Sequence, residues 1–242
     1  MKRIVLPLLL LTGVASFGQS SILKKASSVL NKAKSGTGTS ALSNDDIVAG
    51  LKEALSVGAK NSANKLSAVD GFFANAAIKV LMPPEAKKVE TALRTAGMGK
   101  LVDNAILSMN RAAEEASKSA APIFVNAITS MSISDALNIL KGSDTAATGY
   151  LRGKTVAALT SAFRPVIDTA LSKTAATSYW KTVFDAYNKL PTTFNKINPD
   201  LAGYVTEKSL SGMFFQVAQE EQKIRKDPAA RVTDILKKVF GS

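Results

Sequence analysis

The stretch KLVDNAILSMNRAAEEASKSA, from Lys100 to Ala120, carries the clearest fold signal in this chain of 242 residues. Its apolar residues recur mostly at intervals of three and four positions, which is the spacing of one face of an α-helix. Alanine, the strongest helix former, supplies most of that face. The face consists of Val102, Ala105, Met109, Ala112, Ala113, Ala116 and Ala120. The pattern predicts a helix over residues 100–120 with one buried side.

Similar patterns lie on both sides of this stretch, separated by capping residues, prolines and glycines. Ser43 is a candidate N-cap, Ser132 with Asp135 resembles a capping box, and Gly142 ends the segment that follows. No window alternates apolar and polar residues as a strand does. We therefore predict an all-α fold, a single irregular multi-helix domain of about ten helices with no significant sheet. The expected helices begin at residue 43, cover 72–77, run from 84 to 97, and occupy 100–120, 122–131, 132–142, 146–173, 179–190, 200–226 and 229–240.

Residues 1–18 have the organisation of a secretory signal peptide. Two basic residues precede an apolar run over residues 4–14, and the small residues Ser16 and Gly18 follow it. The run is shorter than the roughly 20 residues that span a bilayer as a helix. We expect cleavage before Gln19, leaving a mature protein of the periplasm or cell envelope without a transmembrane segment. A retained anchor is the alternative. Since the chain has no cysteine, we expect no lipid anchor on that residue.

Residues 19–42 are predicted to be a leader and linker rich in serine, lysine and glycine. Residues 35–40, with the sequence SGTGTS, have the composition of a flexible linker. The segment before them is basic and amphipathic, which suits either a membrane surface or docking on the domain. The helical domain is expected to cover residues 43–242.

The composition excludes several kinds of catalytic and metal site. Histidine and cysteine are both absent, which removes thiolate nucleophiles, imidazole bases, disulfides and the usual zinc ligands. The segment Gly149–Thr155 ends in Gly-Lys-Thr, but only three residues separate its glycines and no strand precedes it. A phosphate-binding loop needs four residues there. We expect no cofactor and no enzymatic activity.

The net charge of the whole chain is +12, and removal of the signal peptide lowers it to +10. A basic balance of this size suits a nucleic acid, an anionic lipid or an anionic envelope surface. The lysine pairs are well separated and no arginine-rich block occurs. We therefore expect a solvated basic surface and no nucleic-acid partner.

The most informative polar residues interrupt an apolar helical stripe near the end of the chain. Glu220 and Glu221 lie between Val217 and Ile224 on the predicted helix 200–226. A carboxylate that faces a core needs a partner, and Arg225 follows Glu221 at the favourable spacing of four. We expect Glu220 or Glu221 to be buried and paired with an arginine. The candidate buried polar network comprises Arg111, Glu114, Asp135, Glu220, Glu221, Arg225 and Arg231.

A structural ion-pair network is our main interpretation of these residues. The alternative is a divalent cation site, because calcium prefers oxygen ligands. Its candidate ligands are Glu114, Asp135, Glu220 and Glu221.

Two groups of motifs resemble one known family. The first contains Asn110-Arg111-Ala112-Ala113-Glu114, Asp135-Ala136 and Gly149-Tyr150; the second contains Gly212-Met213-Phe214, Glu220-Glu221, Ile224-Arg225 and Pro228-Ala229-Ala230-Arg231. With them, the chain resembles the bacterial family catalogued as domain of unknown function 4197 over roughly residues 43–241. The resemblance implies export and a helical fold. It assigns no catalytic residue and no activity.

We therefore expect an exported, non-enzymatic helical envelope protein that acts by binding or scaffolding. The alternative is a carrier of an apolar or lipid-like ligand in a cavity between helices, for which a cavity above about 300 Å³ would be needed.

Overall fold

The computed structural model describes residues 43–189, 196–198 and 200–226. These residues form eight α-helices and one 3₁₀-helix, with no strand among them. The helices are α2 (Asn44–Ser67), η1 (Pro84–Ala86), α3 (Lys87–Thr95), α4 (Gly99–Ser117), α5 (Ala120–Thr129), α6 (Ile133–Lys141), α7 (Ala146–Ser172), α8 (Ala175–Asn188) and α9 (Leu201–Lys226). The all-α prediction is confirmed. The signal peptide, the leader and the helix expected over 229–240 lie outside the described residues.

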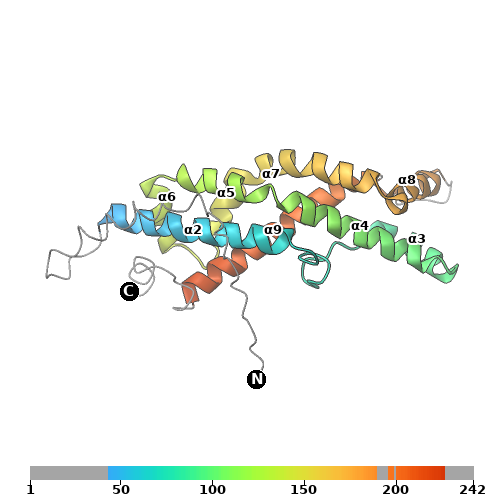
Figure 1. Cartoon of the computed structure of the whole chain (residues 1–242), viewed down its shortest axis with the longest axis horizontal. Coiled ribbons are helices and arrows are strands. Elements are labelled where there is room, and N and C mark those ends of the chain that lie inside the picture. Colours follow the sequence, from blue (N-terminus) through green and yellow to red (C-terminus); the bar gives the residue numbers. More distant parts are fainter. Residues whose placement is uncertain (1–42, 190–195, 199, 227–242) are drawn as a thin grey trace, which may run out of the picture. The chain divides into compact units, whose positions relative to one another are not determined.

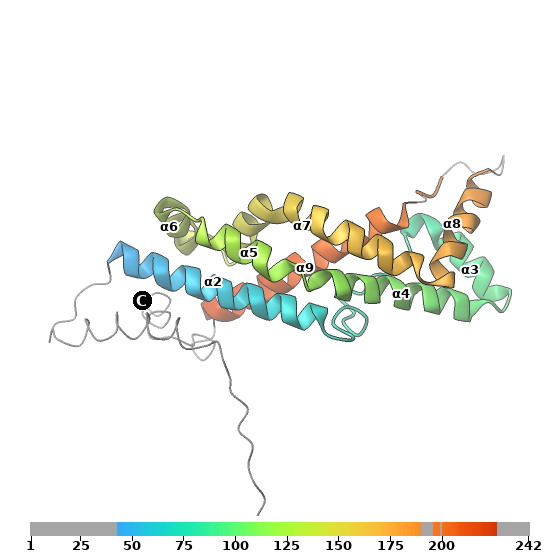
Figure 2. The same ribbon diagram turned by 45° about the horizontal axis from the view of Figure 1, so that its top comes forward.

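Helix α9 packs against three other long helices of the domain. It contacts α2, α4 and α7, and α7 also lies against α4 and α5. In Figures 1 and 2, α9 (orange to red) crosses obliquely behind α2 and α4. Because α9 contacts helices from both ends of the domain, side chains on it hold segments that are far apart in the sequence.

The core beside α9 depends on a close approach that only glycine permits. A Cβ at Gly212 would stand 2.6 Å from the ring of Phe72, which is fully buried. Two residues further on, the Phe214 ring meets Phe124 of α5 edge to face, with 5.9 Å between the ring centroids, a favourable aromatic geometry.

The helix expected at residues 72–77 is absent, and turns take its place. Two features of the preceding residues, Asp70 and Gly71, set the direction of the chain as it enters these turns. Asp70 has a φ of +67°, which an α-helix cannot contain. A Cβ at Gly71 would stand 2.5 Å from the carbonyl oxygen of Lys65, so the chain doubles back against the end of α2. This difference, together with the residues outside the description, explains why eight α-helices are seen where about ten were expected.

Two helix starts are capped as expected. Ser43 forms a capping box with Asp46 before α2, and Ser132 forms one with Asp135 before α6. Among the described helices, none is by itself long and apolar enough to cross a membrane, although α5 and α6 pass that test together as a pair bent by 106°.

Candidate functional site

The buried carboxylate of Glu114 holds the turns that follow α2. Its side chain lies on α4 and is 4% exposed. Oε1 accepts hydrogen bonds from the N–H groups of Phe72 and Phe73 at 3.1 and 3.2 Å. Oε2 lies 2.6 Å from Nη1 of Arg111, whose Nη2 donates to Asp70 at 2.7 Å. The hydrogen bonds to Glu114 and then to Asp70 raise the pKa of Arg111. Arg111 and Glu114 therefore fix the turns at 70–73.

Asn110, the neighbour of Arg111, holds the next part of the same segment. Its Oδ1 accepts from the N–H of Val80 at 2.9 Å, and its Nδ2 donates to the carbonyl oxygen of Val80 at 2.8 Å. The Asn110 side chain is fully buried. Asn110, Arg111 and Glu114 thus attach residues 70–80 to α4, which gives this motif a structural role.

The second buried carboxylate, Glu221, caps a helix of which it is not part. Its Oε1 accepts from the N–H of Ala147 at 3.0 Å, and its Oε2 accepts from the N–H and the hydroxyl of Thr148, both at 2.8 Å. These N–H groups lie in the first turn of α7, where Thr145 makes no side-chain cap. A carboxylate there satisfies free donors and interacts favourably with the helix dipole.

Arg225, four residues after Glu221, caps the C-terminal end of α6. Its Nη2 donates to Glu221 at 2.9 Å and to the carbonyl oxygen of Ile139 at 2.8 Å. Ile139 lies in the last turn of α6, and its carbonyl oxygen also accepts from the N–H of Gly142 at 3.2 Å. The expected pair of Glu221 and Arg225 is therefore present, and it joins the end of α6, the start of α7 and α9.

The remaining candidate residues lie elsewhere. Asp135 caps α6 through Ser132, and the hydrogen bond from the Ser132 side chain lowers its pKa. Its placement in the buried network was wrong, because its carboxylate is used by a local cap. Glu220 is half-buried and accepts from Gln216 at 3.4 Å. Arg231 lies outside the described residues.

The acidic residues do not converge as a calcium site requires. Within the residues that the structure describes, no group of three or more potential ligands could hold a metal ion. The carboxylate oxygens of Glu114 and of Glu221 already accept hydrogen bonds from backbone N–H groups and from an arginine. Arg111 with Glu114, and Glu221 with Arg225, therefore form two separate ion pairs that each hold other parts of the fold in place.

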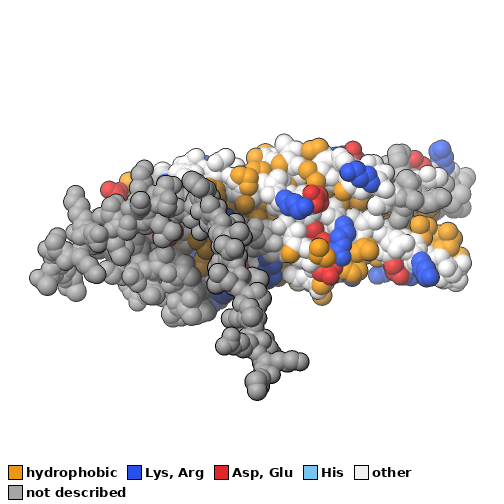
Figure 3. Space-filling view, viewed as in Figure 1, with side chains coloured by type: hydrophobic (Ala, Val, Ile, Leu, Met, Phe, Trp, Pro, Cys, Tyr) orange, Lys and Arg blue, Asp and Glu red, His pale blue; other side chains and the backbone are white. Residues whose placement is uncertain are grey.

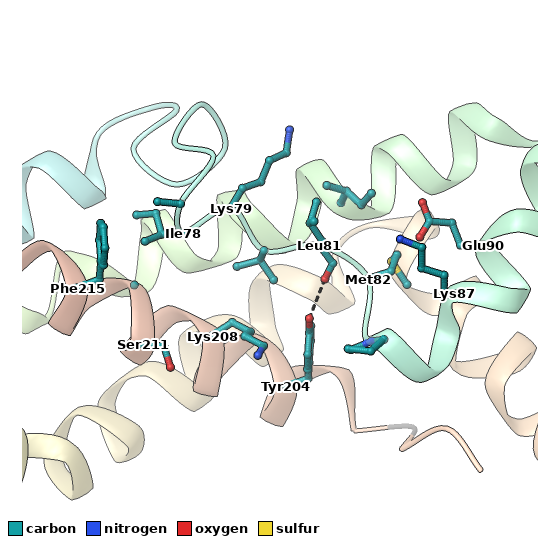
Figure 4. A pocket seen from close by; sticks show the side chains of 15 residues that line it. Ile78, Lys79, Leu81, Met82, Lys87, Glu90, Tyr204, Lys208, Ser211 and Phe215 are labelled. Carbon is teal, nitrogen blue, oxygen red and sulfur yellow. Dashed lines mark hydrogen bonds between the residues drawn. The ribbon is translucent and has the colours of Figure 1, made fainter. Parts of the chain in front are cut away.

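A groove of about 650 Å³ lies between the extended chain after the turns and helix α9. Residues 77–82 and Pro84 form one wall, and Tyr204, Lys208, Ser211 and Phe215 of α9 form the other (Figure 4). Leu81 and Phe215 are 55% and 41% exposed, so the groove has apolar surface that water reaches. No pattern in the sequence indicated this groove, because its opposite wall is more than 100 residues further on.

The polar groups of the groove are mainly basic. Lys79, Lys87 and Lys208 line it together with a single carboxylate, that of Glu90, which pairs with Arg94 at 3.1 Å. Figure 4 places Lys208 on the α9 wall and Lys79 on the opposite one.

Tyr204 joins the two walls of the groove. Its hydroxyl donates to the carbonyl oxygen of Leu81 at 3.0 Å, the contact drawn in Figure 4. Burial, followed by the nearby charges of Glu85 and Glu207, raises the pKa of this tyrosine. The hydroxyl therefore stays protonated and able to donate at neutral pH.

Outside the groove, the described part of the face in Figure 3 shows basic and acidic side chains interspersed, in keeping with a mixed solvated surface.

The fold and these contacts define an all-α protein in which buried ion pairs hold the loops and a lysine-lined groove follows α9. The sequence profile of the family described as "Protein of unknown function (DUF4197)" matches residues 41–241. The chain belongs to this family, as its motifs suggested. No curated protein and no solved structure matches the chain.

Proposed function

We propose that this chain is an exported, non-enzymatic binding protein whose ligand occupies the groove between residues 77–84 and α9. The observation that carries the proposal is the groove itself. Its volume of about 650 Å³ falls within the 300–1,000 Å³ range typical of ligand sites, and its walls combine exposed apolar side chains with three lysines.

The distribution of the carboxylates favours binding over catalysis. A hydrolase with paired carboxylates needs two acids that face each other across a cleft. Here the two buried glutamates are saturated by structural hydrogen bonds, and the acid among the groove-lining residues pairs with Arg94.

The groove suits a ligand that has both anionic and apolar groups. Lys79, Lys87 and Lys208 would meet the anionic groups, while Leu81 and Phe215 would meet the apolar ones. A carrier of a lipid-like molecule would use the same apolar walls, and the exposure of Leu81 and Phe215 supports that alternative.

Titration with 1-anilinonaphthalene-8-sulfonate, an anionic aromatic dye, tests whether the groove binds such ligands. We expect saturable fluorescence enhancement, with affinity reduced about tenfold in Lys208→Glu and in Phe215→Glu. Lys60→Glu makes the same charge change on the exposed surface of α2 and serves as the control. Equal dye affinity in all four proteins would place binding elsewhere and contradict the proposal.

Export is tested separately by intact-mass measurement of protein secreted from a cell that processes signal peptides. The proposal requires a mature chain that begins at Gln19. A mass that includes residues 1–18 would instead favour a retained anchor.

A further inference from the structure

We propose that the groove binds an extended, acidic peptide segment of another protein, which pairs as a β-strand with the chain around Leu81. This inference rests on the proposed function, since it specifies the ligand class of the same groove. It differs from a lipid-like ligand in requiring hydrogen bonds to the backbone of this chain.

The backbone groups of residues 80 and 81 point in opposite directions. The N–H and the carbonyl group of Val80 both bond to the Asn110 side chain, so both point toward α4. In extended chain, successive residues point these groups to opposite sides. Those of Leu81 therefore face α9 and the groove, as the contact between its carbonyl oxygen and Tyr204 also requires.

The backbone of Leu81 is incompletely hydrogen-bonded on this side. The N–H of Leu81 donates to no residue within the part of the chain that the structure describes. Its carbonyl group has one partner, the Tyr204 hydroxyl at 3.0 Å, at an exposed position. A peptide that pairs with this segment would bond to the N–H and carbonyl group of Leu81, because the N–H of Lys79 already donates to Asn75 at 2.8 Å and Pro83 has no N–H. A fatty-acyl chain has no hydrogen-bonding group to offer there.

The charge of the groove indicates that the bound peptide is acidic. The same charge excludes the two ends of this chain as the occupant of the groove. The lining residues carry three lysines against one carboxylate that is paired with Arg94. Residues 19–42 contain four lysines and no acid, and residues 227–242 contain three basic and two acidic residues. Neither terminal segment complements the groove, so the occupant is an acidic segment of a different protein.

The expected ligand pattern follows from the period of a strand. Alternate side chains of the bound peptide point to opposite faces. One set would meet Lys79 and Lys208, and the other would meet Ile78 and Phe215. The groove should therefore select peptides in which acidic and apolar residues alternate.

The experiment is affinity selection by the mature protein from a library of octapeptides with glutamate at every second position and mixed apolar residues between. The tightest peptide is then measured by fluorescence anisotropy, together with a version N-methylated on alternate amides. We expect binding that weakens about tenfold or more on N-methylation, because a strand-pairing donor is lost.

Two variants test the same hydrogen bonds from the protein side. Leu81→Pro removes an N–H that the described fold does not use, and should weaken peptide binding about tenfold. Tyr204→Phe removes the hydroxyl that competes for the Leu81 carbonyl oxygen, and should tighten binding about fivefold. Lys60→Glu is again the control.

Each other result overturns a defined part of the argument. Selection of no peptide, while the dye or vesicles containing phosphatidylglycerol bind in a Lys208-dependent way, overturns the peptide but leaves the groove as a ligand site. If N-methylation, Leu81→Pro and Tyr204→Phe all leave peptide binding unchanged, strand pairing is overturned. Binding of neither peptide nor dye overturns this inference and the proposed function together.

Discussion

Replacing Glu221 by glutamine tests whether one ion pair on α9 holds the ends of two other helices. The Glu221 carboxylate is 5% exposed and accepts from two backbone N–H groups, one hydroxyl and the Arg225 guanidinium. Glutamine keeps one acceptor oxygen and turns an NH₂ group toward donors. It also removes the charge that pairs with Arg225, whose side chain is 12% exposed.

We expect Glu221→Gln to lower the free energy of unfolding by about 3–5 kcal/mol, the usual cost of removing one partner of a buried ion pair. Urea denaturation followed by circular dichroism measures this. The control is Glu115→Gln, which removes an ion pair with Lys118 at a distance of 2.6 Å on the surface of α4. Since an exposed pair contributes about 0–1 kcal/mol, the two variants should differ clearly.

A double variant tests whether Glu221 and Arg225 stabilise the fold only through their ion pair or also by capping the ends of two other helices. When a buried pair is replaced by apolar residues, stability is often kept. In Glu221→Met with Arg225→Met, however, the N–H groups of Ala147 and Thr148 at the start of α7 also lose their acceptor. Each such loss costs about 1–3 kcal/mol, so the double variant should stay at least about 2 kcal/mol below wild type. Wild-type stability in the double variant, or a Glu221→Gln effect as small as that of Glu115→Gln, would refute the reasoning.

Three further predictions concern other contacts of the fold. Asn110→Leu should cost about 2–3 kcal/mol, because it leaves both peptide groups of the extended segment unpaired; Asn104→Leu, at an exposed position of the same helix, should cost little in the same urea denaturation assay. Gly212→Ala should destabilise by about 1–3 kcal/mol through overpacking, whereas Gly149→Ala, with open space around its Cβ position, should stabilise by about 0.5–1 kcal/mol; thermal unfolding of both variants decides this. The pKa of Asp135 is lowered in the folded state, so its contribution is present above its ordinary value near about 4 and is lost as pH falls through the folded value. The stability difference between wild type and Asp135→Ala should therefore be larger at about pH 7 than at about pH 2, and an equal difference at both would contradict it.

Local sequence determined where most of the described helices lie. The apolar stripe of residues 100–120 became α4, and the segment expected over 146–173 became α7. The start of α6 at Ser132 was equally readable, since a capping box is completed within three residues. The pairing of Glu221 with Arg225 was predictable for the same reason, because residues four apart on a helix are neighbours.

Tertiary structure decided what the polar residues bind and where a ligand would fit. Glu114 bonds to N–H groups 41 and 42 residues earlier, and Glu221 bonds to N–H groups 73 and 74 residues earlier. Glu114 attaches the turns after α2 to α4 through the N–H groups of Phe72 and Phe73. The two walls of the groove meet where Tyr204 bonds to Leu81, 123 positions earlier. Helix periodicity and helix caps are local, because they depend on residues only a few positions apart in the sequence. These contacts depend on how whole helices pack, so no short stretch of sequence contains them.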